Sequence, residues 1–202
     1  MSTLTQDKIV CKNVFGSDKL FDQLYPSFIQ LLAKRHWTPI AVAEKAANFL
    51  GAEDNVRVLD IGSGVGKFCL MAAHLRPKAS FHGIEQRKSL IGYAQVARET
   101  TGLNNTNFIN GNFTQIDFRK YDHFYFYNSF YENIVGTEKI DSSIEYSWEL
   151  YNYYNRYLYK QLEMKPTGTR IASYHSMESE IPLSYHVVGS EMQGLLKFWI
   201  KI

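Results

Sequence analysis

Short apolar runs alternate with longer segments of helical periodicity along this chain. Runs rich in β-branched and aromatic residues predict strands at 56–61, 81–85, 106–110, 123–128 and 169–174. Apolar residues at three- and four-residue steps predict helices at 39–50, 68–75, 89–101 and 140–164. Two final apolar runs, 184–188 and 195–202, lie on either side of a glycine-containing turn and predict a hairpin.

The order of these elements predicts the fold class. It is α/β, with a doubly wound, mostly parallel seven-stranded sheet and a C-terminal antiparallel hairpin. Ligands of such sheets lie outside the carboxyl ends of the strands, near the point where the strand order reverses. Asp60, Glu85 and Asn128 fall at the ends of the first, second and fourth strands. We therefore expect these three side chains on one rim.

The N-terminal part of the chain has a different pattern. Residues 1–17 predict a loose arm, and residues 20–33 have a helical period that Pro26 interrupts. We therefore separate residues 1–35, an arm and helix that could serve as a lid, from a main domain at 36–202. Thr38 is the predicted N-cap of the helix that begins at Pro39.

Composition is that of an ordinary globular protein. Hydrophobic residues make up 45% of the 202 residues and charged residues 21%, with a net charge of +2. This balance gives no sign of a nucleic-acid or membrane partner. No apolar run reaches the length of a membrane span, and residues 1–8 lack a signal-peptide core. We expect a cytoplasmic protein.

The cysteine count and the spacing of possible metal ligands predict neither a disulfide framework nor a metal site. Cys11 and Cys69 are too few for a disulfide framework, and Cys69 is expected to be a buried thiol. No set of His, Cys, Asp and Glu residues has metal-ligand spacing, so no metal is expected.

The segment Asp60-Ile61-Gly62-Ser63-Gly64-Val65-Gly66 joins a predicted strand to a predicted helix. Such a turn brings backbone N–H groups close to a ligand. Asp60 disfavours a phosphate there and suits a ligand with a positive group and hydroxyls, such as a sulfonium amino acid joined to ribose. The glycine spacing fits neither the dinucleotide fingerprint nor the phosphate loop.

Two further strand ends carry candidate ligand contacts. Glu85 ends the second strand, where a carboxylate can accept hydrogen bonds from a ribose diol, as it also does in nicotinamide enzymes. Asn112 and Phe113 follow the third strand. They suit the edge and face of an adenine, or they form an ordinary turn.

The segment Asn128-Ser129-Phe130-Tyr131 closes the fourth strand. The Asn128 amide oxygen could accept a hydrogen bond from the N–H of an acceptor amine. Phe130 and Tyr131 could form the walls of a slot that excludes water. The alternative is a strand-ending Asn beside core aromatics. His175, after the fifth strand, is either a substrate contact or a structural histidine. The aromatic residues at helical spacing, Trp148, Tyr151 and Tyr154, are expected to pack in the core.

Residues 36–202 resemble a class I S-adenosylmethionine-dependent methyltransferase. Asp60-x-Gly62-x-Gly64-x-Gly66 is similar to the first motif of that family, Glu85 to its second and Gly111-Asn112-Phe113 to its third. The segment at 128–131 resembles the Asn-Pro-Pro-Tyr signature of amino-group methyltransferases, with Ser129 and Phe130 in place of both prolines. That departure brings it closer to the Asn-x-Phe form of the non-SET protein lysine methyltransferases.

The resemblance implies S-adenosyl-L-methionine as cofactor and a role for each matched residue. Asp60 would lie near its aminoacyl part, and Glu85 would hold its ribose. Thr38 would cover its methionine end. The other implied cofactor contacts are Gly62, Ser63, Gly64, Gly66, Asn112, Phe113 and Asn128. Asn128, Phe130 and Tyr131 are the implied catalytic residues, which orient the acceptor and line its entry.

The expected function is methyl transfer to an amine, either a protein lysine or another amino group. A small-molecule O- or C-methyltransferase is the first alternative. A nicotinamide-dependent oxidoreductase and a non-catalytic binding module are the others. The identity of the acceptor and the oligomeric state stay open.

Overall fold

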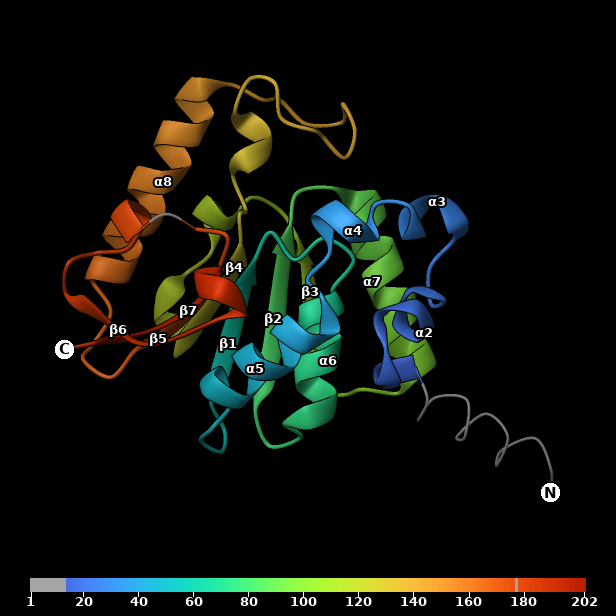
Figure 1. Cartoon of the computed structure of the whole chain (residues 1–202), viewed down its shortest axis with the longest axis horizontal. Coiled ribbons are helices and arrows are strands. Elements are labelled where there is room, and N and C mark those ends of the chain that lie inside the picture. Colours follow the sequence, from blue (N-terminus) through green and yellow to red (C-terminus); the bar gives the residue numbers. More distant parts are fainter. Residues whose placement is uncertain (1–13, 177) are drawn as a thin grey trace.

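The structure, a computed structural model, describes residues 14–176 and 178–202, and it is built around one seven-stranded sheet (Figure 1). The strand order is β3-β2-β1-β4-β5-β7-β6. The strands are β1 (Arg57–Ile61), β2 (Ser80–Glu85), β3 (Thr106–Asn110), β4 (His123–Tyr127), β5 (Arg170–Tyr174), β6 (Tyr185–Glu191) and β7 (Leu196–Lys201). The first five pair in parallel, and β7 runs antiparallel to both β5 and β6. The predicted fold class is confirmed.

The strand order reverses between β1 and β4. β1 pairs with β2 on one side and with β4 on the other, so the chain turns outward in opposite directions from this point. The carboxyl ends of β1, β2, β3 and β4 therefore meet on one edge of the sheet, as the sequence predicts.

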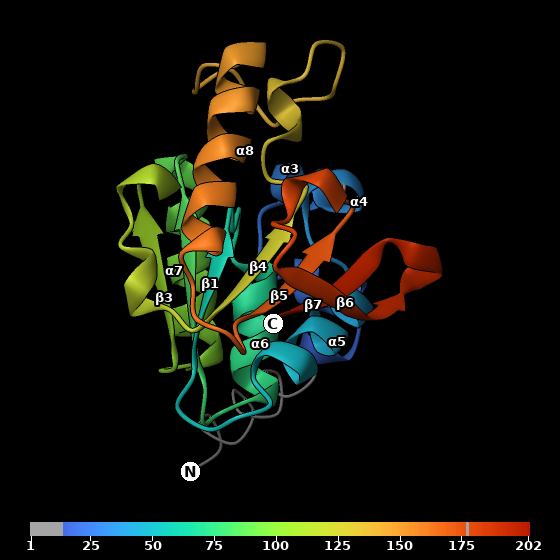
Figure 2. The same cartoon turned by 90° about the vertical axis from the view of Figure 1, so that its left-hand side faces the viewer.

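Helices cover both faces of the sheet (Figures 1 and 2). One face packs against α5 (Ile40–Leu50), α6 (Lys67–Leu75) and α7 (Lys88–Thr101), and its core includes Val58, Phe81 and Phe108. The other face packs against α8 (Trp148–Glu163), and its core includes Leu59, Phe124 and Leu158. Residues 58 and 59 fall on opposite faces because successive strand side chains alternate.

Short helices complete the described chain. The α-helical ones are α2 (Asp18–Asp22), α3 (Ser27–Gln30) and α4 (Ala33–His36). The 3₁₀ turns are η1 (Val14–Gly16), η2 (Phe113–Gln115), η3 (Phe118–Lys120), η4 (Tyr131–Asn133), η5 (Glu178–Glu180) and η6 (Met192–Gly194). The segment between η4 and α8 stands above the carboxyl ends of the strands in both views (Figures 1 and 2).

The described part of the N-terminal segment packs into the same core as the sheet. Phe21 and Ile29 are buried there, and the Tyr25 hydroxyl donates to the Val65 carbonyl at 3.0 Å. Lys67, the first residue of α6, is buried and pairs with Asp22 at 2.6 Å. Residues 14–35 thus share one core with the main domain. Residues 1–13 of the predicted arm, including Cys11, lie outside the described residues, and a lid role for 1–35 stays a prediction.

Two local predictions are wrong. The helix predicted at 140–164 begins only at Trp148, because Ser147 caps it through a hydrogen bond from the Leu150 amide at 3.1 Å. Upstream, the Asp141 carboxylate accepts from the Ser143 amide at 2.9 Å, a local turn that competes with helix formation. Thr38 does not cap α5 either. The Ile40 amide donates to Asp18 instead, at 3.0 Å.

The structure tests two other expectations, the burial of Cys69 and the burial of Trp148. Cys69 is a buried free thiol, as predicted. Trp148, predicted to pack in the core, is 54% exposed and lies at the start of α8. Within residues 14–176 and 178–202, no helix is both long and apolar enough to cross a membrane.

Candidate active site

A cavity of about 610 Å³ opens at the carboxyl ends of the first four strands. Its volume falls within the range of small-molecule sites. The residues at and just after the strand ends that line it are Ile61, Gly62 and Gly64 from β1, Glu85, Gln86 and Arg87 from β2, Gly111 and Phe113 from β3, and Asn128, Ser129, Phe130 and Tyr131 from β4.

The glycine turn after β1 forms the floor of this cavity. Gly62 and Gly64 have φ values of +75° and +54°, a region that side chains disfavour. A Cβ on Gly64 would lie 2.7 Å from the Trp37 ring, which also lines the cavity. Glycine therefore lets Trp37 close over the turn while the backbone stays accessible from the cavity.

Gly66 and Ser63 serve packing in this structure and do not line the cavity. A Cβ on Gly66 would lie 2.4 Å from the Phe108 ring. Ser63 is buried against Gly83, where a Cβ would lie 2.6 Å from the Ser63 side chain. The predicted cofactor roles of Gly66 and Ser63 stay predictions.

Glu85 ends β2 as predicted and lies at the cavity wall. Its carboxylate is buried and accepts hydrogen bonds from the Gly64 amide at 3.3 Å and the Arg87 amide at 2.9 Å. Burial raises the pKa of Glu85, while these bonds and the charge of Arg87 oppose the rise. A carboxylate has about four acceptor positions, so capacity is left for a hydroxyl pair.

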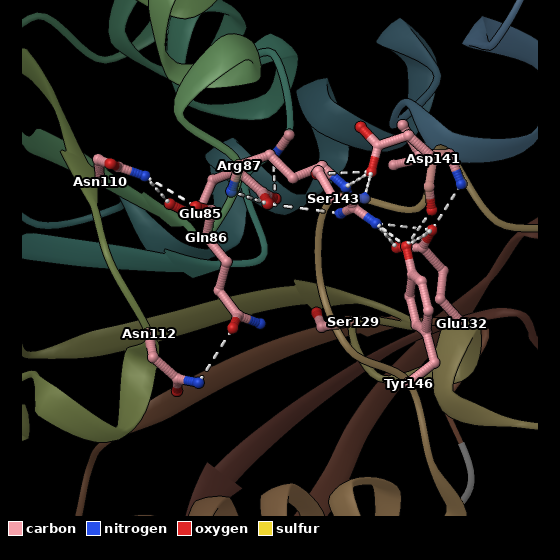
Figure 3. Close-up of polar contacts among 12 residues, drawn as sticks. Glu85, Gln86, Arg87, Asn110, Asn112, Ser129, Glu132, Asp141, Ser143 and Tyr146 are labelled. Atoms are coloured by element: carbon pink, nitrogen blue, oxygen red, sulfur yellow. Dashed lines mark hydrogen bonds and ion pairs between the residues drawn. The ribbon is translucent and has the colours of Figure 1, made fainter.

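Arg87 is a site residue that sequence reasoning missed (Figure 3). Its guanidinium donates to Glu132 at 2.9 Å, to Asp141 at 3.1 Å and to the Tyr146 hydroxyl at 2.5 Å, and it lies 3.5 Å from Glu85. Burial alone would lower the pKa of Arg87, but the carboxylates of Glu132 and Glu85 raise it above its ordinary value. Arg87 thus joins the end of β2 to the segment before α8.

Asp60 lies beneath the glycine turn and outside the cavity lining. Its Oδ2 is 3.5 Å from the Cys69 sulfur, and the side chain is 3% exposed. Burial raises the pKa of Asp60 from 3.8 to about 8. The hydrogen bond from Cys69 lowers this pKa, and the charge of Glu85 raises it further. The proposed contact with an aminoacyl group would therefore need this carboxyl to ionise on binding.

The raised pKa of Asp60 makes stability depend on pH. Between about pH 4 and pH 8 the folded state keeps a proton that the unfolded state releases, so stability falls as pH rises through this window. Asp60→Asn cannot titrate and should escape this loss. We expect its stability relative to the wild type to increase by about 4 kcal/mol between pH 5 and pH 8, since each pH unit in this window costs the wild type about 1.4 kcal/mol.

Urea unfolding of both proteins at a series of pH values measures this difference, and subtracting the wild type cancels the other titrating groups. A difference that stays constant from pH 5 to pH 8 would show that Asp60 is ionised throughout.

Asn112 and Phe113 have different roles, one in packing and one in lining the cavity. The Asn112 amide donates to Gln86 at 3.1 Å (Figure 3). It also donates to the Tyr154 hydroxyl at 2.8 Å, and the Asn112 side-chain oxygen caps η2. Phe113 lines the cavity and stacks on Phe130 with ring centres 5.0 Å apart. Phe113 is therefore placed for the face of a planar ligand, whereas Asn112 joins η2 to α8.

Asn128 and its neighbours line the wall of the cavity that follows β4. Asn128 has a φ of +47°, a conformation that Asn tolerates better than most residues. Phe130 is buried and Tyr131 is 47% exposed, so the slot runs from a dry interior to an open mouth. The Ser129 hydroxyl donates to the Ile61 carbonyl, which fixes the turn after β4 to the end of β1.

The mouth over β4 and β5 is lined by aromatic side chains. They are Tyr127, Tyr131, Tyr174 and His175. Burial lowers the pKa of His175, which favours a neutral ring at neutral pH. Tyr151 and Tyr154 are buried as predicted, although Tyr154 also lines the cavity.

Thr38 does not reach the cavity. It is buried, with its hydroxyl 3.0 Å from that of Tyr125. Its neighbours Lys34, Arg35, His36 and Trp37 line the mouth instead. The predicted contact of Thr38 with a methionine tail stays a prediction, while the loop before α5 does border the site.

A parallel sheet of this order, a glycine turn after β1 and a carboxylate at the end of β2 define the class I S-adenosylmethionine-dependent methyltransferases. Within residues 14–176 and 178–202, no group of His, Cys, Asp and Glu is arranged to hold a metal ion. The profile of the methyltransferase-domain family matches residues 52–193, and the chain belongs to this family. The predicted enzyme class and cofactor are confirmed.

Curated relatives match a limited part of the chain. A tRNA (guanine-N(7)-)-methyltransferase from Microcystis aeruginosa is 46% identical over 54 residues, 27% of this chain and 26% of that protein. A protein of the same name from Synechococcus sp. is 43% identical over 54 residues, 27% of this chain and 23% of its own length. The match thus spans about a quarter of these relatives.

Solved structures share the fold at low identity. TrmN from Thermus thermophilus has a TM-score of 0.59 and 17% identity, covering 84% of this chain and 51% of that one. An RNA methyltransferase from Salinibacter ruber, in complex with S-adenosyl-L-homocysteine, has a TM-score of 0.55 and 19% identity over 81% of this chain and 92% of its own. These likenesses support the fold.

The comparisons change two expectations. The prediction that no nucleic-acid partner is evident is contradicted, since the names of these relatives state tRNA or RNA. The resemblance to the protein lysine subgroup is not confirmed. Net charge averages over the whole surface, so a value of +2 does not exclude a local nucleic-acid-binding surface.

Proposed function

We propose that this chain methylates a nitrogen atom of a nucleobase in RNA. Two curated relatives named as tRNA (guanine-N(7)-)-methyltransferases support this acceptor class. The aromatic side chains around Asn128 also support it, because bases extruded from RNA stack on such rings.

Cationic side chains beside the mouth suit an RNA backbone. Lys34 and Arg35 of α4 are exposed and line the cavity next to the aromatic residues. Phosphate contacts of this kind position a nucleic acid and add sequence-independent affinity. The neighbouring wall, residues 131–147, carries four acidic residues and one lysine, so RNA would approach from the α4 side.

The proposed reaction asks for alignment more than for acid–base chemistry. S-adenosylmethionine supplies a methyl group already activated by its sulfonium. In this proposal Glu85 holds the ribose and the backbone of Gly62 and Gly64 borders the rest of the cofactor. Asn128 orients the acceptor nitrogen, and Phe130 and Tyr131 keep water from it. A ring nitrogen with a free lone pair can accept the methyl group without first losing a proton. A nitrogen that carries a proton can donate it to a neutral His175.

The single observation that carries the proposal is the position of Asn128 between Tyr127, Phe130 and Tyr131 at one cavity wall. This arrangement fits a planar acceptor that must be held by its edge and its face.

The experiment is label transfer from S-adenosyl[methyl-³H]methionine to unmodified tRNA transcripts, ribosomal RNA, total protein and a small-molecule extract. We expect label in an RNA fraction that RNase releases, with a methylated base found by mass spectrometry of its nucleosides. Asn128→Ala supplies the inactive control. Label found only in protein or in small molecules would refute the RNA acceptor and leave the methyltransferase class intact.

A further inference from the structure

Arg87 lies where three parts of the chain meet (Figure 3). Its partners are Glu85 at the end of β2, Glu132 in η4, and Asp141 and Tyr146 in the segment before α8. Only 3% of its side chain is exposed. A guanidinium has five N–H donors in a fixed fork, and here they are divided between the cofactor side and the acceptor side of the cavity.

Arg87 is a buried cation that pairs with two carboxylates of the β4–α8 segment, residues 131–147. This segment contains Glu132, Glu138, Asp141 and Glu145 against a single lysine, Lys139. Without Arg87, the carboxylates of Glu85, Glu132 and Asp141 would face one another with no buried cation between them. Like charges in a partly buried site repel, so the segment would move away from the end of β2.

The same segment forms one wall of the cavity. Ile140, Ile144 and Tyr146 line it, and the Ile140 amide donates to Glu132 at 2.7 Å. A second ion pair, Arg35 with Glu138, joins the segment to α4, but its side chains are 65% and 60% exposed. Exposed pairs contribute little, so the buried contacts of Arg87 decide whether this wall stays in place.

We propose that Arg87 is a positioning residue that couples closure of the β4–α8 segment to cofactor binding at Glu85. A ligand that hydrogen-bonds to Glu85 fixes the carboxylate that Arg87 touches, and this favours the arrangement in which Arg87 also holds Glu132 and Asp141. Coupling between two such sites is reciprocal, so a closed segment must also raise cofactor affinity. The inference rests on the cofactor site proposed above and not on RNA as acceptor.

Trypsin reports on the segment directly, because Lys139 is the one tryptic site between residues 131 and 147 and is exposed. Its ammonium donates to the Glu132 carbonyl at 2.7 Å, so cleavage after Lys139 requires the segment to open. We would measure the rate of this cut with and without S-adenosylhomocysteine, and the affinity for that ligand by calorimetry. In the wild type the ligand should slow the cut by about fivefold or more.

Two matched variants separate the buried pair from the exposed one. Glu132→Gln weakens the contact with Arg87, and Glu138→Gln removes the same charge from the same segment at the exposed pair. Glu132→Gln should lower ligand affinity by about tenfold and reduce the protection to less than about twofold, while Glu138→Gln stays within about twofold of the wild type in both.

Arg87→Met is the stronger second variant, used if Glu132→Gln keeps enough hydrogen bonding to mask the effect, and circular dichroism confirms that it folds. Both variants could be cut faster after Lys139 and yet keep the wild-type affinity for S-adenosylhomocysteine and the full protection that this ligand gives. Arg87 would then be a merely structural residue, and the proposal would be overturned. A wild type that does not bind S-adenosylhomocysteine would overturn the cofactor site itself. Binding without RNA methylation would refute the acceptor alone.

Discussion

Replacing Asn128 by Ala should reduce turnover by about 100-fold while changing cofactor affinity by less than about threefold, because a misplaced acceptor costs far more in rate than in ground-state binding. Asn128 lines the cavity directly after β4, the strand that pairs with β1. In the proposed site the Asn128 amide holds the edge of the acceptor, whereas Glu85 and the glycine turn border the cofactor. Steady-state kinetics and calorimetry with S-adenosylhomocysteine measure the two quantities.

The backbone of Asn128 requires its own control. Its φ of +47° is less favourable for Ala than for Asn, so Asn128→Ala also adds strain. Asn128→Gly removes the amide without that strain, and Asn128→Asp keeps an oxygen of the same shape. Equal losses in the Ala and Gly variants would assign the effect to the amide. A Gly variant with wild-type turnover would contradict the proposed role.

Gly66→Ala should destabilise the fold by about 3 kcal/mol, one of the largest effects expected from a single methyl group in this chain. Gly66 has a φ of +81°, and its Cβ would lie 2.4 Å from the Phe108 ring and 3.1 Å from the Ala94 Cβ. Phe108 is itself buried and cannot move without disturbing the packing of α7 on β3. Thermal unfolding should show a decrease in melting temperature of about 10 °C.

Gly102 supplies a matched control for this prediction. It has a φ of +69° at the end of α7, and a Cβ there would meet nothing within 4 Å. Gly102→Ala carries the backbone cost without the clash and should lose about 1 kcal/mol. Phe108→Leu in the Gly66→Ala background should recover part of the lost stability. Equal losses for the two glycine variants would contradict the packing role of Gly66.

Sequence periodicity predicts the centre of the sheet well because β1, β2, β4 and β5 are buried along most of their length. It fails between Ile140 and Ser147, where apolar residues at helical spacing line a cavity instead of a helix face. Ile140 and Ile144 are apolar because they form a wall of the site, and the Asp141–Ser143 turn prevents helix formation there. A hydrophobic period alone does not distinguish these two reasons for burial.

The glycine motif shows the same limit on a smaller scale. Gly62, Gly64 and Gly66 are equivalent in the sequence, yet only Gly62 and Gly64 line the cavity. Gly66 is needed for Phe108, which lies 42 positions further along the chain (108 − 66). Arg87 was missed for the same reason, since Glu132, Asp141 and Tyr146 become its partners only through the fold. Contacts between distant segments carry no local sequence signal.

We propose that S-adenosylmethionine lies across the ends of β1, β2 and β4. A crystal structure of the protein with S-adenosylhomocysteine would locate the ligand. We expect ribose hydroxyls within hydrogen-bond distance of the Glu85 carboxylate and the sulfur on the side of Asn128. Ligand density elsewhere on the molecule, or a ribose that does not touch Glu85, would rule out this binding mode.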